Sequence, residues 1–459
     1  MALKPRRRST TKPKFRRSRK KGRIGRGKPR RLTSKRWLRR NTRRKSTRRR
    51  RTQLKLLFLT HAFYPESYAG TEKFILNMAR SMIRKGHRVK VVTYSQLPPE
   101  NYPHAVGEVI YREYIHEGVP VVAYRHKQFD PALKFDVGDR GLSLFARKVL
   151  RAEKPDLVHV GHPMRTMAFM QACKQLRIKY VVTLTDFWFI CPKGIMLRND
   201  KSLCGGPGDG GNCLNYCQIP NVQQRLQSHI PLLRSASRVL SPSVFLANLI
   251  RGNLPNLPVE VLNHGMKADN IRVNERIYQP GDTLTLFYGG TLAPHKGVHL
   301  ILEAMSMIPT ERLRLKIYGS GQTEYMQQLE QAAAGLDGRV EFCGVYSEND
   351  LPRIYQDVDV AVVPSIWYEN YPLTLHEALI SQVPALVSNV GGMAEKVADG
   401  FNGFTFRIGE AAHLAERIGQ LLDNPQLLND FKANMRAVQF PTLEQEADTY
   451  ERIYKSIAR

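Results

Sequence analysis

Blocks of apolar residues recur along the chain, and many are followed by a segment with helical spacing. Residues 54–60 form one such block, which is typical of a strand buried in a parallel sheet. Between residues 74 and 82 the apolar positions follow helical spacing, and Gly86 marks the end of that helix. Residues 88–94 form the next apolar block, so the stretch predicts a strand–helix–strand unit. In the loop before the helix, Thr71 is the residue type expected at an N-cap.

The same order continues through the first half of the chain. Residues 117–125 predict a strand at the edge of the same sheet. Helices are expected at residues 142–153 and 244–251. Further strand segments are expected at residues 155–163, 180–185, 238–243 and 259–265.

Residues 266–282, with Pro280 and Gly281, interrupt the pattern and predict a linker. The pattern then restarts, and an amphipathic helix is expected at residues 442–458, after Pro441. The repetition on both sides of the linker predicts two α/β domains, each built like a Rossmann fold. The strand segments of the second half are residues 283–290, 313–321, 339–346, 358–364 and 384–388.

Two glutamates, Glu369 and Glu377, follow the strand segment 358–364. Glu369 is expected in a loop at the carboxyl end of that strand. Pro372 suits the first turn of a helix that would carry Glu377. The next strand segment ends at the Gly391–Gly392 turn. Because ligands of open parallel sheets bind at the carboxyl ends of the strands, we expect these residues at one ligand site.

The residue types at this site favour a sugar nucleotide. A glutamate near a helix start can accept hydrogen bonds from ribose or hexose hydroxyls, and a Gly-Gly turn offers backbone N–H groups to phosphate. Spacing alone is weak evidence, because short motifs match many unrelated sequences and two separate glutamates are commonly surface charges.

The wider context is specific. Two neighbouring motifs resemble the donor-site signature of family-four retaining glycosyltransferases. The first is E-x-x-P-L-x-x-x-E-A, which starts at Glu369, and the second is S-x-x-G-G-x-x-E-x-x-x-x-G-x-x-G, which starts at Ser388. The resemblance covers residues 54–455 and implies the GT-B fold, in which two Rossmann-like domains face a central cleft. The implied parts are a basic arm (1–52), an acceptor domain (53–270) with a cysteine-containing insert (191–217), a donor domain (271–440), and a C-terminal helix (441–459) that crosses back to the acceptor domain.

The resemblance also assigns expected roles to residues. Catalytic roles fall to Glu369, Lys296 and Asp186; donor binding to Gly290, Thr291, Gly319, Glu377, Gly391 and Gly392; and acceptor or cleft positions to Gly70 and His162. His159, within an apolar run, is expected to be a packed core residue. The chain departs from the family pattern at three positions: Ala69 replaces a glycine, Thr185 a histidine and Thr291 an arginine.

The activity implied by the resemblance is the retaining transfer of a hexose from a nucleoside diphosphate sugar to a hydroxyl of a glycan or a lipid-linked acceptor, without a cofactor. Because Thr185 and Thr291 replace a histidine and an arginine of the family pattern, a second interpretation is a protein that binds a sugar nucleotide without catalysis. An enzyme of polysaccharide biosynthesis in the cytoplasm is the expectation, with a peripheral position on the inner face of the membrane as an option.

Charge is very unevenly distributed. Residues 1–51 contain 27 of the 71 Lys and Arg residues and no Asp or Glu, which leaves the remainder with a net charge of +4. So basic and apolar-poor a segment is expected to be disordered and is not typical of a secretory signal. It could bind an anionic membrane surface or nucleic acid, and with only one Trp and one Phe it has little capacity for base stacking. We favour lipid, since many acceptors of the family that the chain resembles are lipid-linked sugars. A later translation start is a third reading of the arm.

Six cysteines in 459 residues do not make a disulfide scaffold, and a reducing compartment fits them best. Four of them fall in the Gly-rich insert. Four thiols could bind zinc tetrahedrally, but their spacing is not that of a usual zinc motif, so free thiols or an occasional disulfide are the favoured reading. These residues are Cys191, Cys204, Cys213 and Cys217.

Overall fold

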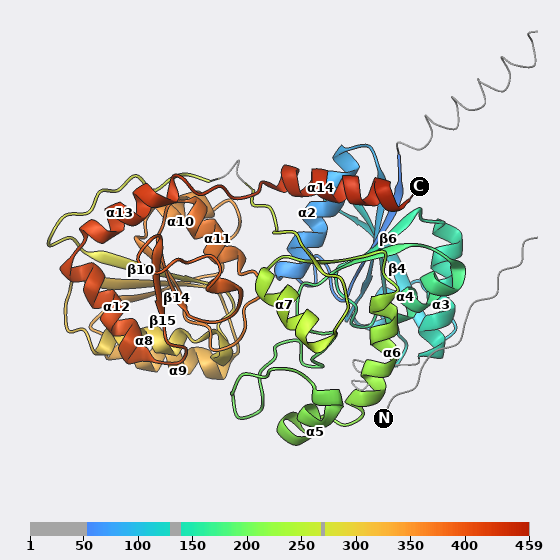
Figure 1. Cartoon of the computed structure of the whole chain (residues 1–459), viewed down its shortest axis with the longest axis horizontal. Coiled ribbons are helices and arrows are strands. Elements are labelled where there is room, and N and C mark those ends of the chain that lie inside the picture. The colour runs from blue at the N-terminus through green and yellow to red at the C-terminus, as the bar shows by residue number, and fades with distance from the viewer. Residues whose placement is uncertain (1–52, 129–138, 268–270, 459) are drawn as a thin grey trace, which may run out of the picture. The chain divides into compact units, whose positions relative to one another are not determined.

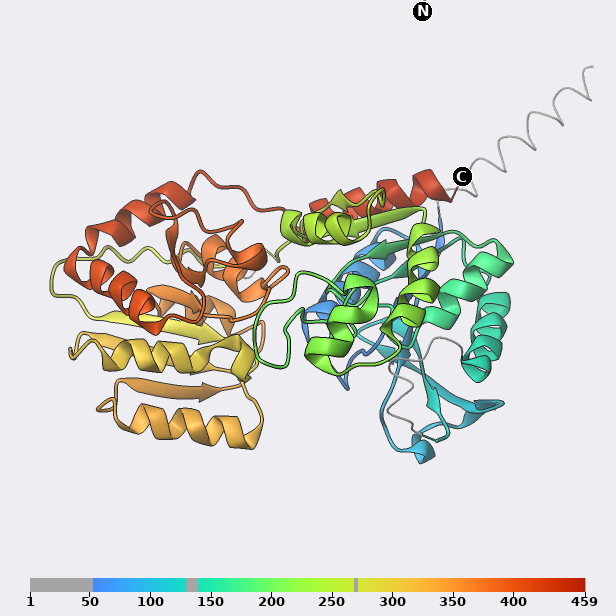
Figure 2. The same cartoon turned by 60° about the horizontal axis from the view of Figure 1, so that its bottom comes forward.

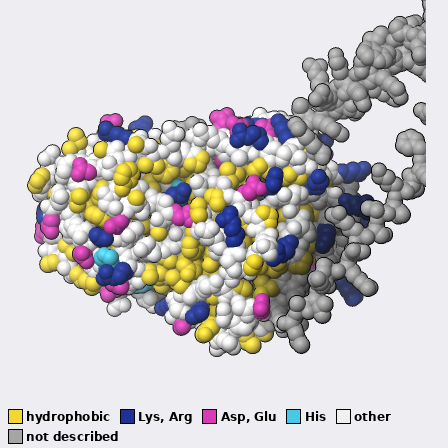
Figure 3. Space-filling model, in the orientation of Figure 1, with side chains coloured by type: hydrophobic (Ala, Val, Ile, Leu, Met, Phe, Trp, Pro, Cys, Tyr) yellow, Lys and Arg dark blue, Asp and Glu magenta, His cyan; other side chains and the backbone are white. Residues whose placement is uncertain are grey.

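The computed structural model describes residues 53–128, 139–267 and 271–458 (Figure 1). The arm predicted at residues 1–52 lies outside the described residues, as do residues 129–138, 268–270 and 459. The described residues form two α/β lobes, each built on its own sheet. On the face shown in Figure 3, acidic and basic side chains of these residues are interspersed, as expected for a part of the chain with nearly balanced charge.

The first lobe contains a nine-stranded sheet in the order β3-β4-β5-β2-β1-β6-β7-β8-β9. From β5 to β9 neighbouring strands are parallel, and β4 pairs antiparallel with both β3 and β5. The strands are β1 (Lys55–Thr60), β2 (Arg88–Tyr94), β3 (His104–Val106), β4 (Val109–His116), β5 (Val119–His126), β6 (Leu157–Val160), β7 (Tyr180–Thr183), β8 (Arg238–Ser241) and β9 (Glu260–Val261).

The prediction that residues 117–125 form an edge strand is wrong. The corresponding strand β5 lies between β4 and β2, with all but one of its residues buried. The irregular stretch before it folds into the antiparallel strands β3 and β4, which extend the sheet beyond β5. The outward-facing polar residues of these two strands hid them in the hydrophobic pattern.

Helices follow most of the strands of the first lobe. The helix predicted after β1 begins two residues earlier than expected, because Ala69 and not Thr71 occupies the N-cap. In α3 the Asp139 side chain accepts a hydrogen bond from the Leu142 N–H at 2.8 Å and so caps the first turn. The helices are α2 (Gly70–Arg84), α3 (Arg140–Glu153), α4 (Met167–Leu176), α5 (Gly211–Cys217), α6 (Val222–Arg234) and α7 (Val244–Asn253).

The second lobe contains a six-stranded, fully parallel sheet in the order β12-β11-β10-β13-β14-β15. Figure 2 shows helices α8 and α9 among the yellow and orange elements of this lobe. Its strands are β10 (Leu284–Gly289), β11 (Leu313–Tyr318), β12 (Val340–Gly344), β13 (Val360–Val363), β14 (Ala385–Ser388) and β15 (Gly403–Phe406). Its helices are α8 (Val298–Ser306), α9 (Thr323–Ala334), α10 (Leu351–Gln356), α11 (Leu373–Ile380), α12 (Ala411–Asp423) and α13 (Gln426–Met435).

The last helix, α14 (Leu443–Ile457), packs on the first lobe beside α2 (Figures 1 and 2). Thr442 caps it with a full capping box. Tyr450 and Tyr454 are completely buried in the core under β1 and α2. The Tyr454 hydroxyl lies 2.6 Å from Nδ1 of His159, which is itself buried in that core. The C-terminal segment therefore completes the core of the first lobe.

Candidate functional site

A cleft of about 1610 Å³ lies between the two lobes. Its walls are formed by loops at the carboxyl ends of strands in both sheets. From the first lobe come the loops after β1, β6 and β7, and from the second the loops after β10, β11, β12 and β13. This is the edge at which parallel α/β sheets bind ligands.

Lys296 and Glu369 meet at the second-lobe wall of the cleft. The Lys296 ammonium donates to Oε1 of Glu369 at 2.7 Å. The same oxygen accepts hydrogen bonds from Ser365 Oγ at 2.7 Å and from Trp367 Nε1 at 2.9 Å. Burial raises the pKa of Glu369, but Lys296 and these hydrogen bonds outweigh it, so the net pKa is lowered. Glu369 is therefore held as a carboxylate in a fixed orientation.

Backbone from two glycine-rich loops approaches the cleft beside this pair. Gly290 follows β10 and Gly319 follows β11, and both line the cleft. A Cβ at position 319 would lie 1.9 Å from the Gly290 carbonyl oxygen, so no residue with a side chain fits there. Gly290 and Gly319 also both have positive φ, which favours glycine. Thr291 is exposed at the cleft wall, in the position where the family pattern has an arginine.

The Gly391–Gly392 turn does not line the cleft, although the sequence placed it at the phosphate. Both glycines are buried, and the Gly392 N–H donates to the carbonyl of Glu369 at 2.7 Å. A Cβ on Gly392 would lie 2.0 Å from the Asn370 carbonyl oxygen. The turn thus supports the Glu369 loop from behind, and the Gly392 N–H is used in that support.

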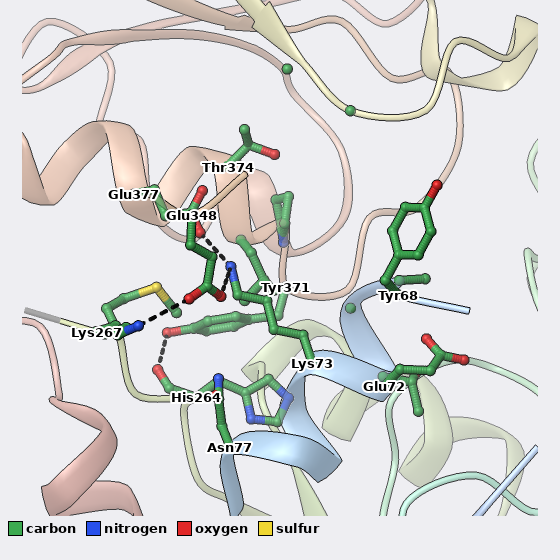
Figure 4. Close-up of a pocket in the computed structure, with 18 of the residues that line it drawn as sticks. Tyr68, Glu72, Lys73, Asn77, His264, Lys267, Glu348, Tyr371, Thr374 and Glu377 are labelled. Atoms are coloured by element: carbon green, nitrogen blue, oxygen red, sulfur yellow. Dashed lines mark hydrogen bonds and ion pairs between the residues drawn. The ribbon is translucent and has the colours of Figure 1, made fainter. Parts of the chain in front are cut away.

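Glu377 lies on α11 and faces the first lobe across the cleft (Figure 4). Pro372 sits at the N-cap of this helix, one position before its first turn. The Lys73 ammonium, from α2 of the first lobe, donates to Oε1 of Glu377 at 2.9 Å and lies 3.0 Å from Oε1 of Glu348. Lys267 lies 3.2 Å from the other Glu348 oxygen. Four alternating charges thus join the two lobes at this end of the cleft.

On the first-lobe wall, His162 and Asp186 form a second fixed pair. His162 accepts a hydrogen bond from the Met164 N–H at Nδ1, so Nε2 carries the proton that it shares with Asp186 Oδ2 at 2.8 Å. The other Asp186 oxygen accepts from the Trp188 N–H at 2.9 Å. Thr185 also lines the cleft, but its hydroxyl donates to the Gly161 carbonyl at 2.8 Å.

Two further ionisable residues of this wall were not predicted from the sequence. The ring of His61 lies 3.9 Å from that of His162 between centroids, and its Nε2 lies 3.6 Å from Oε1 of Glu72. Glu72 is 1% exposed. Burial raises its pKa. Gly70, at the start of the same helix, lines the cleft as expected.

Asn370 joins the lobes directly beside Glu369. Its Nδ2 donates to the carbonyls of Leu184 at 3.3 Å and Thr185 at 3.1 Å. Its Oδ1 accepts a hydrogen bond from Ser243 Oγ at 2.7 Å. The residue next to the buried carboxylate therefore fixes the second-lobe loop against the loop after β7.

The cysteines of the insert surround a small apolar cavity away from the cleft. All are free thiols, three of them buried. Within the residues that the structure describes, no group of three or more His, Cys, Asp or Glu side chains is placed to hold a metal ion. The zinc alternative therefore has no preformed site here. The residues are Cys191, Cys204, Cys213 and Cys217.

The sequence missed Lys73, Glu348 and Asn370 because each acts across the lobes. Lys73 lies 304 positions from Glu377, and no local pattern marks such a pairing. For Glu72 a signal existed, since it is an acidic residue in the first turn of α2, two positions after Gly70, which was expected at the cleft.

Each lobe matches a family model of known glycosyltransferases. Residues 271–438 match the model of glycosyl transferases group 1, and residues 68–270 match that of Glycosyltransferase Family 4. An uncharacterized glycosyltransferase of Methanocaldococcus jannaschii is 23% identical over 368 residues, covering 76% of this chain and 84% of that protein. The lipopolysaccharide 1,2-N-acetylglucosaminetransferase of Salmonella typhimurium is 26% identical over 211 residues, covering 42% of this chain and 52% of that protein.

Among solved structures, HepE of Anabaena in complex with UDP and glucose is similar with a TM-score of 0.64 and 19% identity, covering 88% of this chain and all of that one. The two lobes and the cleft between them define the GT-B class of glycosyltransferases, which confirms the fold expected from the sequence. With a Family 4 domain in the first lobe and a group 1 domain in the second, the chain is a GT-B glycosyltransferase of the GT4 type.

In the described part of the chain, no helix combines the length and the apolar character that a membrane span requires.

Proposed function

We propose that the protein transfers a hexose from a nucleoside diphosphate sugar to a hydroxyl group of a glycan or lipid-linked acceptor, with retention of the anomeric configuration. One observation carries the proposal: a buried carboxylate, Glu369, is paired with an ammonium, Lys296, at the wall of a cleft whose opposite wall carries the fixed His162–Asp186 pair. A hydroxylated, anionic ligand suits the first wall, and a second, hydroxyl-bearing ligand suits the other.

Each part of the donor has a matching group. Lys296, Thr291 and the backbone near Gly290 and Gly319 would bind the diphosphate. Glu369 would accept hydrogen bonds from hexose hydroxyls, and Glu377 from the ribose. A carboxylate has about four acceptor lone-pair sites, so the three donors on Oε1 of Glu369 leave its second oxygen for the sugar.

We infer the following reaction for residues in these positions. The bond between the anomeric carbon and the β-phosphate oxygen breaks, and its electron pair stays on the leaving diphosphate. Lys296 and the backbone N–H groups would stabilise that charge as it develops. The acceptor hydroxyl forms the new bond on the same face, and its proton passes to the departing phosphate oxygen. Asp186, fixed by His162 and the Trp188 N–H, would orient that hydroxyl.

Glu369 is not assigned the role of a nucleophile. The retaining glycosidase mechanism requires two carboxyl groups about 5–5.5 Å apart that flank one glycosidic bond. Here the second glutamate, Glu377, belongs to the ribose end and is paired with Lys73. The two carboxylates therefore serve different parts of one donor.

Two of the similar proteins support the two substrates by analogy. HepE of Anabaena is described in complex with UDP-glucose, and the Salmonella typhimurium relative is named for transfer to lipopolysaccharide. We extend the substrate classes to this chain, a nucleotide sugar as donor and a glycan or lipid-linked glycan as acceptor.

The test is a transfer assay with a panel of UDP, GDP and ADP hexoses and oligosaccharide acceptors. Release of nucleoside diphosphate and formation of a glycosidic product are measured, and the anomeric configuration is read by NMR. Donor consumption with retained configuration supports the proposal. Donor binding without turnover would favour the non-catalytic sugar-nucleotide-binding reading, and an inverted product would contradict the retaining mechanism.

A further inference from the structure

Lys73 is the charged residue that ties the first lobe to the proposed ribose end of the donor site. It projects from α2 and lies between Glu348 and Glu377, both of the second lobe (Figure 4). Its Nζ is 2.9 Å from Oε1 of Glu377 and 3.0 Å from Oε1 of Glu348. Its side chain is 24% exposed and that of Glu377 is 12% exposed, so the pair is largely shielded from water.

Shielding makes the pair stronger than a surface ion pair. Burial lowers the pKa of Lys73, but the two carboxylates raise it more, so the ammonium stays charged. Lys73 in turn lowers the pKa of Glu348, against the opposing effect of burial. Without the Lys73 ammonium, the carboxylates of Glu377 and Glu348 would face each other, and only Glu348 would keep a positive partner, Lys267. The Glu377 carboxylate would then turn away from its like-charged neighbour.

The geometry leaves room for a ligand on Glu377. Lys73 donates its hydrogen bond to Oε1, one of the two carboxylate oxygens of Glu377. A carboxylate offers about four lone-pair sites, so an ammonium on one oxygen fixes the group while hydroxyl donors use the rest. Glu377 lines the main cleft and also a smaller cavity of about 50 Å³ behind it, which Lys73 borders as well.

We propose that Lys73 is a positioning residue for the nucleotide donor: from the first lobe it orients the Glu377 carboxylate of the second lobe for the ribose hydroxyls. The inference rests on the proposed function, which assigns the ribose to Glu377. It adds that the donor site is not complete within the donor lobe. Donor affinity then depends on the two lobes being together, and the lobe that binds the acceptor helps to select a ribonucleotide.

The test compares nucleotides that differ in the ribose. Binding of UDP, GDP, ADP and CDP is measured by calorimetry, and the tightest of the four is compared with its 2′-deoxy and 3′-deoxy forms. The full chain is used as wild type, Lys73→Met, Lys73→Arg and Lys267→Met. Lys267 contacts the same Glu348 but not Glu377, which makes it the matched control. Thermal unfolding of each variant checks that it is folded.

We expect Lys73→Met to raise the Kd of the ribonucleotide by about tenfold. This is the loss of affinity expected when one hydrogen bond to a charged group is lost. The Kd of the deoxy form that the wild type binds more weakly should change by less than about threefold, because that ligand lacks the hydroxyl that Glu377 holds. Lys73→Arg should restore part of the preference for ribose. Lys267→Met should leave both values near those of the wild type.

Two kinds of failure can be told apart. If the wild type prefers ribose and Lys73→Met weakens the ribonucleotide and the deoxy forms by the same factor, Lys73 supports the lobes in general and the positioning role is wrong. If the wild type binds both forms equally, or binds none of the four nucleotides, the ribose assignment in the proposed function is wrong, and the inference falls with it.

Discussion

The Nζ atom of Lys296 lies 2.7 Å from Oε1 of Glu369, so the residue assigned to the diphosphate and the residue assigned to the hexose are directly paired. Each therefore sets the electrostatic environment of the other. With Lys296 removed, a buried carboxylate would be left beside the diphosphate. With Glu369 neutralised, the ammonium would be left wholly to the phosphates. Opposite effects on nucleotide binding follow from the two changes.

Replacement of Lys296 by alanine should reduce turnover by about 10²-fold or more, since it removes a preorganised charge at the leaving group. It should also weaken nucleoside diphosphate binding, because Glu369 then repels the phosphates. Steady-state kinetics and calorimetry measure the two effects. Lys174→Ala, an exposed lysine of α4, is the control. Turnover like that of the wild type in Lys296→Ala would remove this residue from the site.

Glu369→Gln should separate catalysis from nucleotide binding. The loss of charged hydrogen bonds to the hexose costs about 1.5–3 kcal/mol, which is roughly ten- to hundredfold in kcat/KM for the sugar donor. The affinity for the free nucleoside diphosphate should stay the same or increase, because Lys296 no longer shares its charge with a carboxylate. A parallel loss of affinity for the free nucleotide would show that Glu369 supports the fold of the loop and not the sugar.

His159 should make the fold sensitive to acid. Burial lowers its pKa to about 3, while the unfolded chain has a pKa near 6.5. A lowered histidine pKa means that the unfolded state binds the proton first, so stability is full above pH 6.5 and falls as the pH decreases toward 3. At pH 5 the loss from this residue is about 2 kcal/mol.

Denaturant unfolding at pH 7 and pH 5 measures this loss. In His159→Gln, which keeps a donor and an acceptor for Thr183 and Tyr454 but does not titrate, the difference between the two pH values should be smaller by that amount. His104→Gln, at an exposed histidine, is the matched control. An equal pH dependence in wild type and His159→Gln would contradict the prediction.

The basic arm should act separately from the catalytic lobes. Residues 1–51 carry 27 positive charges, while the rest of the chain has a net charge of +4 and little field of its own to attract a polyanion. Removal of residues 1–51 should therefore abolish most binding to anionic liposomes and to DNA, and leave transfer to a small acceptor unchanged. Binding by the full chain should decrease steeply with salt.

Liposome and DNA binding are compared in parallel, and we expect lipid to be the stronger partner. Tighter binding to DNA at physiological salt would reverse that preference. Loss of transfer to the small acceptor on truncation would show that the arm is part of the catalytic unit.

The sequence predicted what depends on local pattern. The apolar block at 54–60 became β1. Glu369 and Glu377, which follow the strand segment 358–364 in the sequence, both line the cleft. The sequence failed where a contact joins distant segments. No pattern around Lys73 points to Glu377, and nothing local reveals that the Gly392 N–H is used by the Glu369 carbonyl. The antiparallel strands before β5 were missed because their outward-facing residues are polar.

The burial of Tyr450 and Tyr454 under the first sheet has a consequence for engineering. The first lobe is made of two stretches of chain that are far apart in sequence, and its core is not closed without the second. A chimera that exchanges acceptor lobes between related enzymes must therefore move α14 together with residues 53–267. A cut at the linker alone would pair each new lobe with a foreign tail, whose aromatic residues would have to fit a hollow shaped for Tyr450 and Tyr454.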